Sequence, residues 1–261
     1  MQITSFPNTI LFITGAFLGN SCWAEWKLFF ENKGYKCIAP AWPNKESSPE
    51  ELRNTHFSAS IASIRLAGLI EYFSSIAKGL PEKPILIGHS LGGLIVQLLL
   101  QLDLGMVGVA MHSFPPKGVN AKFPFLRAMW KAAGPITSTR TTYLISFNRW
   151  KYTIANGMTC EQQKELYYAY AIPESKLVIR DVFKSIAKVD FKKSHPPLLF
   201  TSGGQDKIIP TSMNYDNYKK YSAENSIMGF KEFKERNHLV FSQQSWIEEA
   251  EFILYWLEGL R

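Results

Sequence analysis

Ser90 stands among residue types that can turn a serine hydroxyl into a nucleophile. Gly88 and Gly92 lie two positions on either side of it, in the segment GHSLGG. An apolar run at 85–87 precedes this segment and a longer one at 94–100 follows, which predicts a strand, a tight turn and a helix. A turn this sharp strains the serine backbone and presses its flanking positions together, so only residues with little or no side chain fit there. The pattern therefore predicts a reactive serine at the end of a strand.

This segment resembles the nucleophile elbow, G-x-S-x-G, of the α/β-hydrolase family. In that family a histidine takes the proton of the serine, an acid orients the histidine, and the order along the chain is serine, acid, histidine. Leu91 opens the helix after Ser90, so its N–H is free to bind an oxyanion. The resemblance implies a serine hydrolase whose acid and base lie downstream of Ser90.

Asp206 and His238 fit this order. Asp206 follows the apolar run 196–201, and two glycines before it permit a turn. His238 lies after the last predicted strand and before the closing helix. The alternatives are an aspartate that caps the next helix and a histidine with a structural role. Four other histidines fit the order less well: His56, His89, His112 and His195.

The loop after the first strand is expected to complete an oxyanion hole. Gly15 lets the chain turn, and we expect the Ala16 N–H to donate beside the Leu91 N–H. The family usually has histidine where this chain has Thr14, and often Asp-x-Pro-Gly where this chain has AWPN at 41–44. Three aromatic side chains are expected to contact the substrate: Phe17, Trp23 and Trp130.

The resemblance runs nearly end to end and implies an α/β-hydrolase fold, a mostly parallel sheet with helices on both faces and a mainly helical cap insertion. Alternating strand and helix patterns independently predict an α/β protein with a parallel sheet. The strands are expected at 9–13, 36–39, 85–87, 106–111, 196–201 and 229–233. The helices are expected at 22–33, 58–78, 94–100, 160–171 and 246–257, and a polar loop at 47–49.

The alternation breaks between residues 115 and 194, where short aromatic and basic stretches are interrupted by proline and glycine. This stretch is too long for a plain connection. We therefore expect a cap or lid domain at 115–194, inserted into a core domain formed by 1–114 and 195–261.

The net charge of +7 comes from a single segment. Residues 104–160 hold seven lysines and arginines and no acid, while the remaining chain is balanced at 22 of each sign. One reading is a lid with solvated cations; the other is a lid that meets an anionic head group or lipid surface. Basic residues also recur every fourth position, as on one helix face, at Lys176, Arg180, Lys184 and Lys188. No nucleic-acid motif accompanies this charge, so we expect no nucleic-acid partner.

The composition fits a globular α/β protein of 261 residues with 46% hydrophobic residues. Three cysteines make no disulfide framework, and no secretory signal or run of about 20 apolar residues is visible, so a cytoplasmic location is expected. The sequence leaves the oligomeric state open.

The predicted reaction is hydrolysis of a carboxylic ester or thioester through an acyl-enzyme, on a small-molecule ester or acyl substrate, with no cofactor and no metal. Serine at the elbow disfavours dehalogenases and epoxide hydrolases, which the resemblance associates with aspartate there. The alternative is a ligand-binding or signalling protein on the same fold with little turnover.

Overall fold

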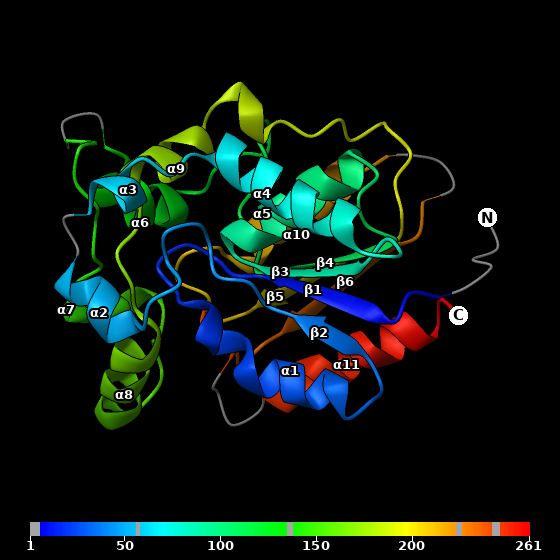
Figure 1. Cartoon of the computed structure of the whole chain (residues 1–261), viewed down its shortest axis with the longest axis horizontal. Coiled ribbons are helices and arrows are strands. Elements are labelled where there is room, and N and C mark those ends of the chain that lie inside the picture. Colours follow the sequence, from blue (N-terminus) through cyan, green and yellow to red (C-terminus); the bar gives the residue numbers. More distant parts are fainter. Residues whose placement is uncertain (1–5, 56–57, 135–137, 223–225, 242–245) are drawn as a thin grey trace.

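The computed structural model describes residues 6–55, 58–134, 138–222, 226–241 and 246–261. A six-stranded sheet in the order β2-β1-β3-β4-β5-β6 forms its centre (Figure 1), and each neighbouring pair is parallel. The strands are β1 (Thr9–Ile13), β2 (Lys36–Ile38), β3 (Ile85–His89), β4 (Val107–Met111), β5 (Leu198–Gly203) and β6 (Met228–Phe233). The predicted parallel sheet is confirmed.

Helices cover both faces of this sheet (Figure 1). One face carries α1 (Ala24–Glu31) and α11 (Trp246–Glu258), and the other carries α4 (Leu66–Gly79), α5 (Leu91–Gln101) and α10 (Thr211–Lys220). All residues of β1, β3, β4 and β5 are buried. Covered strands need apolar side chains on both sides, which explains their continuous apolar runs. The result is a rigid platform for the loops at its carboxyl edge.

The expectation of one helix at 58–78 is wrong. The chain forms α3 (Ala59–Ala62) and α4, and Arg65 between them has extended backbone angles (φ −121°, ψ 154°). The Ser175 hydroxyl contacts the Ile64 carbonyl oxygen at 2.7 Å, and Asp181 pairs with Arg65 at 2.6 Å. These partners lie more than 100 residues away, so local periodicity could not register the break.

The predicted polar loop at 47–49 leads directly into a helix, α2 (Pro49–Asn54). Ser48 accepts from the Glu51 backbone N–H, and the Glu51 carboxylate accepts from the Ser48 N–H. This reciprocal pair is a capping box, and proline at the first helical position adds to it. The signal was therefore present in the sequence as S-x-x-E.

Between β4 and β5 the chain forms α6 (Phe123–Ala133), α7 (Phe147–Thr153), α8 (Cys160–Tyr170), α9 (Lys176–Asp181) and the short 3-10 helix η2 (Ser185–Ala187). In Figure 1 helices α6–α9 gather on the left of the sheet, together with α2 and α3. The predicted helical stripe of four basic residues is wrong, because α9 ends at Asp181. Lys176 is buried and its ammonium donates to the Ser138 carbonyl at 2.8 Å, while Lys184 pairs with Asp181 at 3.1 Å.

Candidate active site

The turn at Ser90 has the strained geometry that its glycines indicated. Ser90 adopts φ 58° and ψ −117°, between the end of β3 and the start of α5. A Cβ on Gly88 would lie 2.3 Å from the Gly92 carbonyl oxygen, and a Cβ on Gly92 would lie 2.0 Å from the Ile13 carbonyl oxygen. Side chains at either position would force the turn open. The packing thus holds the Ser90 hydroxyl at the carboxyl edge of the sheet.

Ser90, His238 and Asp206 form a continuous hydrogen-bonded chain. His238 Nε2 lies 3.0 Å from Ser90 Oγ, and His238 Nδ1 lies 2.7 Å from Asp206 Oδ2. All three residues are at most 6% exposed. A ring that donates from Nδ1 to a carboxylate has its Nε2 lone pair directed at the serine. This arrangement is able to take a proton from Ser90.

Asp206 has all its acceptor sites occupied. Its Oδ1 accepts from the backbone N–H groups of Ile208 and Ile209 at 2.8 Å each, and its Oδ2 also faces His112 Nδ1 at 3.0 Å. Burial alone would raise the pKa of Asp206, but the His238 and His112 imidazoles outweigh it and hold the pKa below its ordinary value. The carboxylate is therefore ionised and fixed in place.

His112 is the partner that chain order failed to identify. The order serine, acid, histidine excluded it as the base, and the structure adds it as a second imidazole on the acid. It lies just after β4 with φ 44°. Of the other histidines, His195 is half-buried and donates from Nδ1 to the Pro196 carbonyl at 2.7 Å, and His56 lies outside the described residues.

His89 supports the loop that carries His238. Its Nε2–H donates to the His238 carbonyl oxygen at 2.8 Å, and the two rings are 4.8 Å apart. Burial, followed by the neighbouring His238 and His112, holds the pKa of His89 well below its ordinary value. The ring is thus a neutral donor that fixes the backbone of His238.

This buried neutral ring predicts a loss of stability in acid. The unfolded chain binds a proton at His89 below about pH 6.5, whereas the folded chain does not, so the free energy of unfolding should fall by about 1.4 kcal/mol per pH unit from this group. We expect His89→Gln to reduce the slope between pH 6.5 and 5 by that amount, measured by urea unfolding at each pH. His195→Gln, at a half-buried site whose pKa is also lowered by burial, should change it less. Equal slopes in the natural chain and His89→Gln would contradict the assignment.

The loop after β1 presents unused donors to this site. Within the described parts of the chain, neither the Ala16 N–H nor the Leu91 N–H donates a hydrogen bond to the protein. Gly15 lies against the elbow, where a Cβ would be 2.8 Å from the Cβ of Ser90. Thr14, in place of the histidine that the family resemblance implies, accepts from the indole Nε1 of Trp23 at 3.0 Å. The hydroxyl and the indole together fix the start of this loop.

A buried ion pair joins the loop after β2 to the segment before α9, and its carboxylate also binds the loop after β1. Lys45 Nζ lies 2.7 Å from both carboxylate oxygens of Glu174, and both side chains are nearly inaccessible. Glu174 Oε2 also accepts from the Phe17 N–H at 3.1 Å, and Phe17 has the unusual φ of 69°. Burial lowers the pKa of Lys45, and the attraction of Glu174 opposes that shift. No spacing in the sequence pointed to this pair.

The three aromatic residues predicted to contact substrate lie in different surroundings. Phe17 is buried in the loop beside the site, with its ring 5.9 Å from that of Tyr143. Trp23 is fully buried in the core, where it packs against Phe12 and Phe241, a position that supports the loop. Trp130 is 64% exposed on α6. Of the three, Phe17 lies on the loop whose Gly15 packs against Ser90, while Trp23 is in the core and Trp130 is on the surface of α6.

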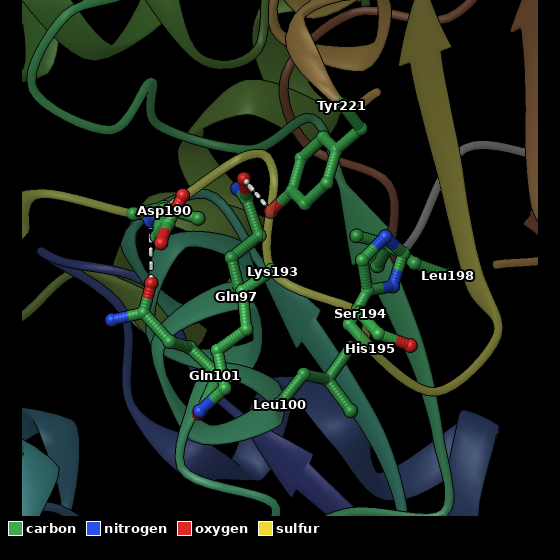
Figure 2. A pocket seen from close by; sticks show the side chains of 10 residues that line it. Gln97, Leu100, Gln101, Asp190, Lys193, Ser194, His195, Leu198 and Tyr221 are labelled. Atoms are coloured by element: carbon green, nitrogen blue, oxygen red, sulfur yellow. Dashed lines mark hydrogen bonds between the residues drawn. The ribbon is translucent and has the colours of Figure 1, made fainter. Parts of the chain in front are cut away.

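Two cavities flank the core. One of about 410 Å³ lies between α6, α7 and the loop 206–210, and Arg127, Arg149 and Lys207 contribute cations to its wall. The other, of about 10 Å³, is lined by residues of α5 and of 189–198 together with Tyr221, whose hydroxyl points to Gln97 (Figure 2). That volume holds one water at most. Of these two cavities among the described residues, the larger has room for part of a substrate.

His112, Asp206 and His238 also offer three ligand atoms within 4.8 Å of one another, a spacing that a metal ion could bridge. Both histidine nitrogens, however, already bond to Asp206 Oδ2. An ion there would remove the acid from His238, so the donor set fits proton transfer better than metal binding. None of the described helices is long and apolar enough to span a membrane.

The chain matches a protein family by sequence and several solved structures by fold. The model of a family described as "Alpha/beta hydrolase family" matches residues 10–250. No curated protein matches the chain by sequence. Similar solved structures include a monoacylglycerol lipase from Paleococcus ferrophilus (20% identity, 98% of this chain and 97% of that one, TM-score 0.69), a methylesterase from Arabidopsis (15%, 96% and 99%, 0.67) and polyneuridine aldehyde esterase (18%, 95% and 98%, 0.65). Identities this low show a shared fold.

Proposed function

Since this chain belongs to the alpha/beta hydrolase family and is a hydrolase, we propose that it cleaves a carboxylic ester or thioester with Ser90 as nucleophile, His238 as base and Asp206 as the orienting acid. The observation that carries this proposal is the chain of short contacts from Ser90 Oγ through both nitrogens of His238 to Asp206. Esterases and a lipase among the similar structures support the same reaction class.

In the first half-reaction Ser90 Oγ bonds to the acyl carbon while its proton passes to His238 Nε2. The Ala16 and Leu91 N–H groups bind the oxyanion, because they have no other acceptor within the described residues. The ester C–O or thioester C–S bond then breaks, and His238 returns the proton to the leaving alcohol or thiol. Water, deprotonated by His238, releases the acid and restores Ser90.

The segment 115–194 is the proposed cap over this site. Ser90 is 3% exposed, so a cover formed by this segment would leave little of the serine open to solvent. We assign Phe17 to the acyl pocket because it lies in the loop after β1. We assign the cavity between α6 and α7 to a part of the substrate beyond the reacting carbonyl. Its three cations favour an anionic substituent there. The three cysteines are free, which supports the proposed cytoplasmic location.

A fluorophosphonate probe and a series of p-nitrophenyl esters of increasing chain length test the reaction. We expect the probe to add to Ser90, with loss of fluoride, as located by peptide mass spectrometry, and the esters to turn over. Labelling of Ser90 without turnover of any ester or thioester would favour the alternative, a ligand-binding protein on this fold. No adduct at Ser90 would overturn the proposed nucleophile.

A lipid surface is a second candidate partner, supported by α6. Phe123 (73% exposed), Leu126 and Trp130 lie at helical spacing on this helix and face solvent. The surrounding segment 104–160 carries cations and no acid. Apolar side chains flanked by cations suit the interface of an anionic membrane. We propose that α6 touches such a surface when the substrate is a lipid.

Vesicle binding tests that contact. We expect the chain to co-sediment with vesicles that contain phosphatidylserine, more weakly with phosphatidylcholine alone, and about tenfold more weakly when Phe123 and Trp130 are both alanine. Tyr255→Ala provides the control, since Tyr255 is 77% exposed on α11 and outside this segment. Equal binding by the natural chain, the double alanine variant and Tyr255→Ala would exclude α6 as the contact.

A further inference from the structure

His112 connects the acid of the proposed triad to a second buried carboxyl group. Its Nδ1 lies 3.0 Å from Asp206 Oδ2, and its Nε2 lies 4.0 Å from Oε1 of Glu249 on α11. His112 and Glu249 are both fully buried. A Cβ on Gly203 would lie 2.5 Å from Cε1 of His112, so the glycine leaves the space that the ring occupies. The fold thus holds this imidazole between two carboxyl groups.

We propose that His112 and Glu249 are positioning residues for the reaction: His112 donates a second imidazole N–H to Asp206, and Glu249 keeps that hydrogen on Nδ1. The inference rests on the proposed triad and extends it by two residues. A purely structural role would affect folding alone. The proposed role affects how strongly Asp206 binds and orients His238.

The chemistry of the ring supports this assignment. If Glu249 is protonated, its O–H is the donor toward His112 Nε2, and the neutral ring then carries its hydrogen on Nδ1. The contact of 3.0 Å between His112 Nδ1 and the ionised Asp206 itself requires a hydrogen on Nδ1, because a carboxylate only accepts. That hydrogen points at Asp206. A small side-chain rotation or one water closes the 4.0 Å separation.

The polar groups around His112 are costly to bury without partners. Within the described residues, His112 Nε2 has no partner at hydrogen-bond distance, and the Thr201 hydroxyl is the neighbour whose hydrogen bond lowers the pKa of the buried Glu249 carboxyl. Each unpaired buried polar atom costs about 1–3 kcal/mol, and an apolar side chain in place of Glu249 would avoid that cost. The carboxyl group therefore has a use other than packing.

Titratable groups from four parts of the fold face His112. Asp206 and His238 lie on loops after β5 and β6, His89 lies on β3, with its ring 6.1 Å away, and Glu249 lies on α11. Arg236 and Glu248 lie farther out and also act on Glu249. Burial raises the pKa of the Glu249 carboxyl, and the His112 ring opposes that shift. Glu249 therefore holds its proton to a higher pH than an ordinary glutamate.

The rate of Ser90 labelling by a fluorophosphonate, measured from pH 5 to 9, tests the inference without knowledge of the substrate. In His112→Ala, Asp206 loses one of the donors that hold its carboxylate in place, so His238 is less well oriented and labelling should slow by about tenfold. The less neutralised Asp206 also attracts protonated His238 more strongly, so the acid limb of the pH profile should move to higher pH. His112→Asn, whose amide donates from a similar position, should recover at least a third of the rate and the original limb. His195→Ala, outside the site, controls for loss of a histidine.

Glu249→Leu separates positioning from folding. The burial of the Glu249 carboxyl outweighs its contacts with His112 and Thr201, so its removal should raise the urea midpoint, while labelling slows by about threefold because the His112 hydrogen is no longer held on Nδ1. Labelling at the natural rate and pH profile in both His112→Ala and Glu249→Leu, with the natural chain labelled at Ser90, would overturn the inference and leave the proposed function intact. A natural chain that is not labelled at Ser90 would instead overturn the proposed function.

Discussion

Replacing Ser90 with alanine is expected to lower kcat for ester hydrolysis by about six orders of magnitude. The substitution removes the oxygen that His238 Nε2 faces at 3.0 Å, and no other hydroxyl takes its place in the chain of contacts. What remains is the rate that binding and the oxyanion donors supply alone. The measurement is kcat with the best p-nitrophenyl ester, together with loss of fluorophosphonate labelling.

A matched variant at the same position separates catalysis from strain. Ser90 has φ 58°, which costs a serine or an alanine free energy and costs glycine little. Ser90→Gly should therefore raise the free energy of unfolding by about 1 kcal/mol relative to Ser90→Ala, while both remain inactive. Activity in either variant above about one hundredth of the natural rate would remove Ser90 from the mechanism.

Replacing Lys45 with methionine is expected to lower the free energy of unfolding by about 3–5 kcal/mol. The substitution leaves the Glu174 carboxylate buried, and its remaining partners among the described residues are the backbone N–H groups of Phe17 and Ser175. An uncompensated charge in that position costs far more than the attraction that the pair provides. Urea unfolding at pH 7 measures the loss.

Two further variants identify the cause. Lys45→Met combined with Glu174→Gln removes both charges and should recover most of the lost stability, because no charge is left unpaired. Lys83→Met breaks an exposed pair with Asp103 of similar length, 2.6 Å, and should cost less than about 1 kcal/mol. A double variant as unstable as the single one would show that shape, and not charge, makes Lys45 necessary.

The elbow and the parallel sheet were predictable because their signals are local. Gly88 and Gly92 must flank a turn of this kind, and a covered strand such as β3 needs a continuous apolar run. The order of residues along the chain, taken from the family resemblance, was enough to select Asp206 and His238, which the fold places in contact with Ser90 in one chain of bonds.

The parts that sequence reasoning missed depend on contacts between distant segments. His112 and Asp206 are 94 positions apart, and Phe17 and Glu174 are 157 apart. Helical periodicity predicted one helix at 58–78. In the fold, Ser175 binds the backbone carbonyl of Ile64 and Asp181 pairs with Arg65, and the helix is interrupted there. Periodicity also could not tell that Trp23 faces the core. The pattern of residue types along a helix or strand indicates which of its faces is apolar. It does not indicate which other segment packs on that face.

The Lys45–Glu174 pair has a consequence for exchanging parts of this protein with relatives. A chimaera that replaces residues 115–194 alone would bring in a foreign side chain at 174 and keep Lys45, a lysine with 3% of its side chain exposed and no counter-charge. The hydrogen bond of 2.9 Å from Arg53 to the Ala171 carbonyl would also be disturbed, because Ala171 lies in the replaced segment. The unit that can be transplanted intact is therefore larger than the inserted segment, and its border in the core runs through residues 45–53.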